Sequence, residues 1–500
     1  MRLLPLFTLL PVAAAAQDPI AVARAYRETH APMILRHYAE TLALPNVASD
    51  SANIARNADH LVGLLRRHGV PSRVLTRPGV PPLVYGRMDV PGATRTIGIY
   101  VHYDGQPAGT GAWVNPPWQP QLYTGPVTAG GIARPWPADG EAVNPEWRIY
   151  GRSASDDKAP FAALFPTLSA LQQAGIQPTS NVVFLFEGEE EAGSAHLGAY
   201  FGDLRDLLDP VDLWLIFDGP VHQSGRPQLV FGVRGVASLD VTVYGPIRPL
   251  HSGHYGNWAP VPGRLLSQLL ATMWLDDGRV AVRGFYDDVI PLDPEARAAL
   301  DALPNQDAAL RTDLGLAASE GDGRLEARLL EPALTVLGLR SADVGAEARN
   351  VIPTDATAAL GLRLVAGNDP TRLQELIEDH IRRQGYHIVR APPDAAIRAR
   401  YARIAQVTRG GGYRAARTPL DHPAARAVIA AARRVAGNDL LLVPGLGGSL
   451  PLYLFTETLG KPTVIVPMVN ADNNQHAENE NVRVGNLWLG MELMAAMLTM

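Results

Sequence analysis

Apolar runs that end in polar residues alternate with helical patterns through the first part of the chain. The runs typical of buried strands lie at 96–104, 181–191 and 211–220. Apolar residues at helical spacing, which predict helices, lie at 18–43, 51–68 and 158–175. A long loop is expected at 106–150, where proline and glycine are frequent and periodicity is weak. Strands alternating with helices favour an α/β fold, with a mostly parallel sheet flanked by helices on both faces.

A second pattern begins at about residue 232. The strands it predicts lie at 236–245, 334–340, 356–365 and 386–391, and the helices at 261–274 and 369–385. The order βαββαβ is typical of an α+β ferredoxin-like sandwich. The segment 276–332 fits no pattern. After residue 400 the first pattern returns, with a helix at 422–436, a strand at 462–468 and a closing helix at 485–499.

These patterns predict one domain made of residues 17–231 and 401–500, interrupted by an inserted domain at 232–400. The chain of 500 residues is long enough for two domains. Its 47% hydrophobic and 19% charged residues are ordinary for a soluble globular protein. A net charge of −6, spread over many sites, indicates neither a nucleic acid nor a membrane as a partner.

Residues 1–16 have the pattern of a secretory signal peptide. Arg2 precedes an apolar stretch, and Ala14 to Ala16 form a small-residue cleavage site. A buried N-terminal helix is the alternative. We therefore expect an exported protein, periplasmic or secreted, of bacterial type. The absence of cysteine suits that expectation, and it leaves His, Asp and Glu as the side chains available to hold a metal ion.

Five residues of the metal-ligand type stand in separate segments: His102, Asp156, Glu191, Asp218 and His476. Two imidazoles and three carboxylates suit two zinc ions about 3.5–4 Å apart that share one carboxylate. Three of the five follow apolar strands, and the carboxyl ends of parallel strands meet at one edge of a sheet. Such strand endings are common in α/β proteins, so the joint occurrence of all five carries the prediction.

Two neighbours of these residues have candidate roles. Asp104 lies on the same side of an extended chain as His102, so it can accept the N–H of that imidazole, or it can simply cap a turn. Glu189, Glu190 and Glu191 crowd three negative charges after a strand, which is unfavourable unless a cation neutralises them. A solvated acidic run before a helix is the alternative. We favour a metal site in which one acid binds the ion and its neighbour takes a proton from water.

The segments that carry these residues resemble the zinc-dependent aminoacylase and carboxypeptidase family of metallopeptidases. That family includes acetylornithine deacetylase, succinyl-diaminopimelate desuccinylase, glutamate carboxypeptidase and the carnosinase-type dipeptidases. The resemblance covers nearly the whole chain after residue 16, and the segments HYDGQPA and GGSLP are most similar to the dipeptidase branch. The chain departs from the family pattern at Ser153 and at Ala159–Pro160, where glycine is common. Neither departure removes a ligand.

The resemblance implies roles for the metal-site residues. One zinc would be held by His102, Asp156 and Asp218, and the other by Asp156, Glu191 and His476. Asp156 would bridge the two ions, with Asp157 as the alternative bridge. Glu190 would be the general base, and Asp104 would orient His102. Mn²⁺ or Co²⁺ could replace zinc.

The resemblance also implies that the inserted domain is a lid and a dimerisation domain. His251, in HSGHYG, would reach the site of the partner subunit, although an ordinary loop histidine is the alternative. Arg363, with Asn350 alongside, would bind the substrate carboxylate, although a surface ion pair is the alternative. Gly448 and Ser449 would contact substrate.

The function expected is that of a dizinc exopeptidase that hydrolyses dipeptides or short peptides with a free C-terminal carboxylate, as a homodimer. An N-acyl amino acid deacylase, using the same metals, is the first alternative. An aminopeptidase of related fold would lack the lid, and the roughly 258 residues between Asp218 and His476 argue against it. A non-catalytic peptide-binding protein should show gaps in the ligand set, and none is found.

Overall fold

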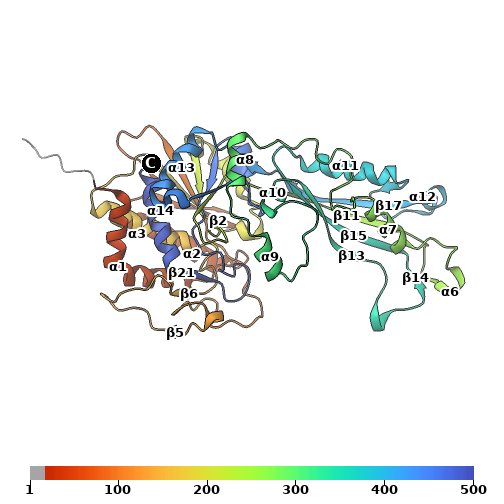
Figure 1. Cartoon of the computed structure of the whole chain (residues 1–500), viewed down its shortest axis with the longest axis horizontal. Helices are drawn as coiled ribbons and strands as arrows, with labels where there is room; N and C mark the ends of the chain where they lie inside the picture. The colour runs from red at the N-terminus through yellow and green to blue at the C-terminus, as the bar shows by residue number, and fades with distance from the viewer. Residues whose placement is uncertain (1–16) are drawn as a thin grey trace, which may run out of the picture.

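The computed structural model describes residues 17–500, which form a large and a small lobe along the longest axis of the molecule (Figure 1). The predicted signal peptide, residues 1–16, lies outside the described residues. Within residues 17–500, the helices are all too short or too polar to cross a membrane.

An eight-stranded sheet forms the centre of the large lobe, in the order β1-β2-β7-β3-β8-β20-β9-β19. In that order the strands are Ser72–Arg77, Val80–Met88, Asn181–Glu187, Thr96–His102, Leu213–Ile216, Thr463–Ile465, Gln228–Val230 and Leu441–Val443. The four central strands, from β7 to β20, run parallel to one another. The mostly parallel sheet predicted from the apolar runs is confirmed.

Helices cover both faces of this sheet because neighbouring residues of each buried strand point to opposite sides. Ile99 and Phe184 pack in one core against the large helices, whereas Tyr100 and Leu185 pack in a second core against the short ones. The large helices are α1 (Pro19–Leu42), α2 (Ser51–Arg67), α3 (Ala159–Gln173), α13 (Pro423–Ala436) and α14 (Val484–Leu498). The short ones include α4 (Leu197–Asp203) and α5 (Arg205–Leu208). The α/β fold class is therefore confirmed.

The expected loop at 106–150 contains part of a second, smaller sheet of the large lobe. Its antiparallel strands follow the order β21-β6-β4-β5, with bounds Asn481–Arg483, Arg148–Tyr150, Gln121–Tyr123 and Ala133–Arg134. The pairing of β21 with β6 joins the segment after His476 to the segment before Asp156. Strands this short leave little periodicity in the sequence, so the sequence alone predicts a loop here.

The small lobe is a five-stranded sheet in the order β13-β15-β11-β17-β16. In that order the strands are Ala333–Arg340, Asp355–Leu364, Gly235–Tyr244, Ile404–Tyr413 and His387–Val389. Helices α7 (Pro262–Ala271) and α11 (Pro370–Arg383) share a hydrophobic core with it. The elements of the expected βαββαβ unit are all present, and β17 is inserted between its first and last strands.

Strand β17 changes the expected domain division, because residues directly after 400 were assigned to the first domain. This strand instead pairs with β11 along most of its length. We propose that the chain returns to the large lobe after residue 413, near β18 (Ala416–Arg417), which pairs with β10 (Gly232–Val233). Within the unassigned segment 276–332, helix α8 (Pro294–Asp301) buries Ala296 and Leu300 in the cores of the large lobe. Helices α9 (Asp307–Asp313) and α10 (Leu325–Arg328) follow it.

A buried carboxylate should stabilise the small lobe. Glu378 on α11 accepts hydrogen bonds at 2.7 Å from Arg390 and from Arg409. Burial alone would raise the pKa of Glu378, but these two guanidinium groups lower it from 4.5 to about 2. Because the pKa is lower in the folded state, the stabilisation is present above about pH 4.5 and is lost as the pH falls towards 2.

We expect Glu378→Gln to lower the free energy of unfolding by about 2–3 kcal/mol at pH 7, and by less at pH 3. Glu375→Gln, which alters a half-exposed acid 3.6 Å from the same Arg409, should cost less than about 1 kcal/mol. Urea unfolding at both pH values measures the difference. Equal losses in the two variants, or a Glu378→Gln deficit that is unchanged at pH 3, would contradict the account.

Candidate metal centre

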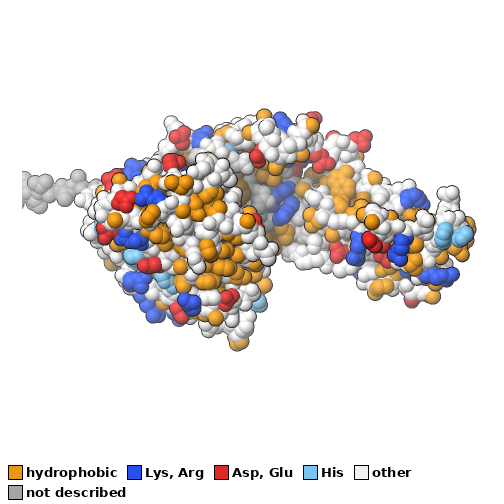
Figure 2. Space-filling view, turned by 90° about the horizontal axis from the view of Figure 1, so that it is seen from below, with side chains coloured by type: hydrophobic (Ala, Val, Ile, Leu, Met, Phe, Trp, Pro, Cys, Tyr) orange, Lys and Arg blue, Asp and Glu red, His pale blue; other side chains and the backbone are white. Residues whose placement is uncertain are grey.

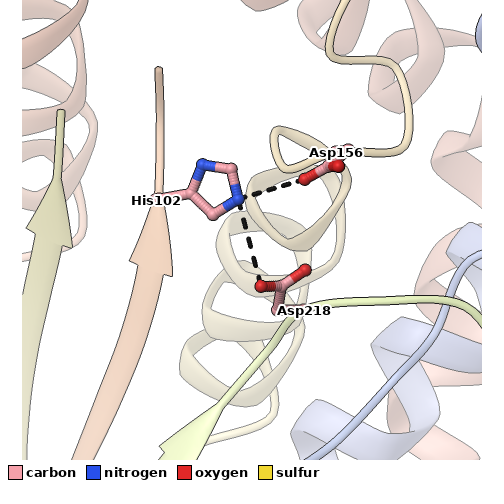
Figure 3. Close-up of side chains that lie close together, drawn as sticks. All are labelled: His102, Asp156 and Asp218. Atoms are coloured by element: carbon pink, nitrogen blue, oxygen red, sulfur yellow. Dashed lines mark hydrogen bonds and ion pairs between the residues drawn. The ribbon is translucent and has the colours of Figure 1, made fainter. Parts of the chain in front are cut away.

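One group of metal-ligand side chains forms where two neighbouring strands end (Figure 3). His102 is the last residue of β3, and Asp218 follows β8, its parallel neighbour. Asp156 comes from the loop before α3. The Nε2 atom of His102 lies 3.1 Å from Asp156 Oδ1 and 4.0 Å from Asp218 Oδ2. All three residues are buried.

A second group contains Asp156 again, together with Glu191 and His476. Glu191 lies in a 3-10 turn (Glu190–Ala192) just beyond β7, and His476 lies in the loop between β20 and β21. The Nε2 atom of His476 is 3.0 Å from Asp156 Oδ2 and 3.2 Å from Glu191 Oε2. The two imidazoles therefore face different oxygens of the same carboxylate.

The arrangement fits two divalent cations. In each group the ligand atoms lie within 4.8 Å of one another, and they are imidazole nitrogens and carboxylate oxygens, which suit zinc. Within residues 17–500, the ion pairs of Asp156, Asp218, Glu190 and Glu191 are with the two imidazoles and with no Lys or Arg. The five residues expected from the sequence are thus brought together, and their role as ligands stays a prediction.

The electrostatics of the site also favour cations. Burial and the nearby carboxylates of Asp156 and Glu191 raise the pKa of Asp218 to about 7. Burial, with Asp218 and Glu191, raises the pKa of Glu190 well above its ordinary value. Hydrogen bonds to Asp156 and Glu191 raise the pKa of His476 to about 10. Several carboxylates are close together here without enough positive charge nearby to balance them. Divalent cations would neutralise this repulsion.

Asp104 has more partners than the sequence indicated. Its Oδ1 lies 3.3 Å from His102 Nδ1, so it is placed to fix the tautomer of that ring. Its two oxygens also accept the backbone N–H groups of Glu190, at 3.1 Å, and Glu191, at 3.0 Å. One buried carboxylate therefore positions an imidazole and the acidic turn together. The Oε2 atom of Glu190 lies 4.0 Å from His102 Nε2.

Three residues at the site are not predicted by the sequence patterns. Gln106 donates to Glu191 Oε2 at 2.9 Å, and Gln475 donates to Asp156 Oδ2 at 3.1 Å. Glu480 is fully buried beneath the Asp156 loop. Only their position within the motifs HYDGQP and NNQHAEN could indicate that the two glutamines lie at the site. Glu480 lies in a polar run that reads as exposed.

Two of the expected substrate-binding residues meet where the lobes join. Arg363, on β15 of the small lobe, donates from Nη1 to Ser449 Oγ of the large lobe at 2.8 Å. Next to it, Gly448 O accepts the backbone N–H of Arg234 at 3.1 Å. Figure 2 shows the two lobes separated by a hollow with basic side chains in its wall. Burial and the negative charge of Glu190 raise the pKa of Tyr413, whereas the positive charge of Arg363 lowers it.

The other two expected substrate-binding residues lie elsewhere. His251 ends β12 (Leu250–His251), which pairs with β14 (Val351–Ile352), and Asn350 O accepts the N–H of Ser252 at 3.0 Å. Helix α6 (Ser252–Tyr255) and β14 are at the end of the small lobe that points away from the large lobe (Figure 1). His251 and Asn350 are therefore close together, are exposed, and are remote from the metal-ligand groups of the same chain.

Comparisons with known proteins give one consistent result. The sequence profile of Peptidase family M20/M25/M40 matches residues 98–500. The chain is 26% identical to a Cys-Gly metallodipeptidase of Candida albicans, over 93% of this chain and 94% of that one. It is 24% identical to the human Beta-Ala-His dipeptidase, over 83% and 77% of the two chains. The crystal structure of an M20 family metallo-carboxypeptidase from Sulfolobus solfataricus superposes with a TM-score of 0.75 at 26% identity, covering 93% and 98%.

The comparisons contradict the expectation of export. Relatives from three yeasts, all Cys-Gly metallodipeptidases, match most of the chain and are cytosolic enzymes. The expectation rests on the composition of residues 1–16 and on the absence of cysteine, and both are weak support for export.

Proposed function

The chain belongs to peptidase family M20/M25/M40, whose members are metal-dependent hydrolases, and we propose that it is a dipeptidase with two divalent metal ions. Zinc is the ion that the donor set favours. The substrates would be dipeptides or short peptides with a free C-terminal carboxylate. The observation that carries the proposal is the pair of ligand groups sharing Asp156, with Glu190, whose side chain is 12% exposed, beside them.

The two ligand groups support one assignment of the metal-binding residues. His102, Asp156 and Asp218 would hold one ion, and Asp156, Glu191 and His476 would hold the other. Bound ions of this type lower the pKa of water towards about 7 and polarise the carbonyl of a peptide bond. Asp104 would keep Nε2 of His102 directed at the ion, because its Oδ1 lies 3.3 Å from the opposite nitrogen of the ring.

Glu190 would move the proton. Its carboxylate lies beside the ligands and is partly shielded from solvent. This desolvation, together with Asp218, raises its pKa, which brings the group closer to the range useful for proton transfer near neutral pH. Its Oε2 would take a proton from the attacking water and then give it to the nitrogen of the leaving amine. The hydrogen bond from the backbone N–H of Glu190 to Asp104 fixes the backbone position from which the Glu190 side chain extends.

Arg363 and Ser449 would bind the C-terminal carboxylate of the substrate. Arg363 is exposed and its Nη1 is engaged with a neutral hydroxyl, so its charge is available to a ligand. A guanidinium group can bind a carboxylate through two parallel hydrogen bonds. The names of the two dipeptidase relatives, which act on Cys-Gly and on Beta-Ala-His, support small peptides as the substrate class.

We also propose that the enzyme is a homodimer through the small lobe. The distance of His251 and Asn350 from the ligands of their own chain supports this, since a second chain could bring them to a site. Strand β13 lies at the edge of its sheet and exposes Leu337 and Leu339. A fully active enzyme with the mass of one chain in light scattering would contradict the dimer.

A substrate panel tests the proposed function. With zinc added, we expect cleavage of free dipeptides, little cleavage of the same dipeptides with an amidated C-terminus, and none after a chelator is added. Amine release measures all three. Cleavage of N-acetyl amino acids alone would instead identify a deacylase, and no cleavage of any compound would favour a peptide-binding protein.

Arg363→Ala should raise KM for a free dipeptide by about tenfold to a hundredfold, since hydrogen bonds to charged groups are worth about 1.5–3 kcal/mol. It should leave the slow cleavage of the amidated dipeptide unchanged, because that substrate has no carboxylate to bind. Arg383→Ala, at an exposed position on helix α11 of the same lobe, is the matched control. A KM for the free dipeptide within twofold of the native value would remove Arg363 from carboxylate recognition.

A further inference from the structure

Glu480 is a fully buried acid, four residues after His476, and it has no role in the proposed chemistry. Its Oε1 atom accepts the N–H of Ser155 at 2.9 Å, the hydroxyl of Ser155 at 2.8 Å and the N–H of Asp156 at 2.9 Å. Its Oε2 atom accepts from Arg152 Nη1 at 2.9 Å and from the N–H of Ser153 at 2.8 Å. Five donors from the Asp156 loop thus converge on one carboxylate.

The backbone of Glu480 binds the same loop. Its carbonyl accepts the N–H of Gly151 at 3.0 Å, and the next residue, Asn481, begins the pairing of β21 with β6. The segment that carries His476 and the segment that carries Asp156 are therefore already joined through their backbones, and the Glu480 side chain adds further hydrogen bonds between them. Both segments contain residues with positive φ, Ser153 at 62° and His476 at 63°, which non-glycine residues rarely adopt without support.

Other hydrogen bonds of the Asp156 loop join it to other parts of the chain. Lys158 donates to the carbonyls of Thr41 and Leu44, at the end of α1 and just beyond it. Tyr38, on α1, donates to the carbonyl of Ala154 at 2.7 Å. These bonds hold the loop against the first helix. Apart from the contact of His476 itself with Asp156 and the amide of Gln475, Glu480 supplies the side-chain hydrogen bonds that join the loop to the His476 segment in residues 17–500.

We infer that Glu480 is a positioning residue that fixes the carboxylate of Asp156 relative to His476 before any metal ion binds. The inference rests on the proposed metal site and deepens it. Because Asp156 belongs to both ligand groups, one buried carboxylate would prepare both groups for binding. Residues that orient metal ligands in this way typically contribute 10–100-fold to metal affinity.

A carboxylate is required at this position, since all five partners are donors. In Glu480→Gln, one acceptor oxygen becomes an NH₂ group that faces other donors. If the NH₂ group replaces Oε2, the buried guanidinium of Arg152 loses its acceptor on this side chain. If it replaces Oε1, the N–H groups of Ser155 and Asp156 lose their acceptor. Either result loosens the loop without removing a ligand.

The test is zinc affinity of the metal-free protein, measured by competition with a chelating dye. Glu480→Gln should bind zinc at least tenfold more weakly than the native protein and still bind two ions at saturation. Asp472→Asn is the matched control, because Asp472 lies in the same segment but its side chain contacts Arg148 and Asn470. It should stay within twofold of native. Circular dichroism verifies that each variant is folded.

A folded Glu480→Gln protein that binds zinc as tightly as native would overturn the inference. Should the variant fail to fold, hydrogen exchange of the native metal-free protein decides the question. The amides of Ser153, Ser155 and Asp156 should then exchange slowly, and exchange as fast as that of an exposed loop would overturn the inference. A native protein that binds no zinc but protects these amides would refute the proposed function and leave the preformed loop established.

Discussion

Glu190→Gln should lower kcat for a dipeptide by about 10²–10⁴-fold, because the amide cannot take a proton from water or return it to the amine. The same variant should bind the native amount of metal, since Glu190 belongs to neither ligand group. Steady-state kinetics and metal analysis of the same preparation give the two numbers. The combination of lost turnover and retained metal is what separates a general base from a ligand.

Glu189→Gln is the matched control for this prediction. Glu189 is the preceding acid of the same run, but its carboxylate lies 2.7 Å from His196 Nδ1, outside the ligand groups. Its kcat should stay within about threefold of native, a change of under 1 kcal/mol in the barrier. Near-native turnover in Glu190→Gln with metal retained would remove Glu190 as the base, and equal losses in both variants would indicate a general disturbance of the turn.

Asp156→Asn should abolish high-affinity binding of both metal ions. Each oxygen of Asp156 faces a different imidazole, so the amide would leave one group with a donor NH₂ in place of an acceptor and remove the negative charge from both. We expect zinc affinity to fall by more than about 100-fold, since even residues that only orient ligands contribute 10–100-fold. Calorimetric titration of the metal-free variant measures affinity and stoichiometry together.

Asp157→Asn tests the alternative bridge. Asp157 is buried next to Asp156, and burial together with Asp218 raises its pKa well above the ordinary value. A neutral carboxylic acid and an amide are similar in size and polarity, so zinc affinity should change by less than about tenfold. A loss in Asp157→Asn that exceeds the loss in Asp156→Asn would assign the bridge to Asp157.

The strand-end residues could be predicted from the sequence because two physical constraints coincide there. Parallel strands buried on both faces are continuous apolar runs, so their ends are visible in the sequence. The polar residues at those ends gather at one edge of the sheet. His102 and Asp218 follow this logic directly, and the structure places them beside each other. His476 does not directly follow such a strand, so its residue type and its occurrence with the other four residues predict a ligand, and the family resemblance implies which ion it holds.

The parts that could not be predicted depend on contacts between distant segments. Strand β17 was missed because Gly410, Gly411 and Gly412 interrupt its apolar pattern, whereas pairing with β11 stabilises it in the fold. Glu480 reads as exposed within a polar run, and only the converging donors of the Asp156 loop explain its burial. The separation of His251 from its own ligands depends on the length of the small lobe, which local patterns do not contain.

The measurement that tests the account most directly is hydrolysis of a free dipeptide by the metal-free protein as zinc is added stepwise. The account predicts no activity without zinc and a rise that reaches its plateau at two zinc ions per chain, one for each ligand group that contains Asp156. A plateau at one ion, activity in the metal-free protein, or no hydrolysis with two ions bound would contradict it.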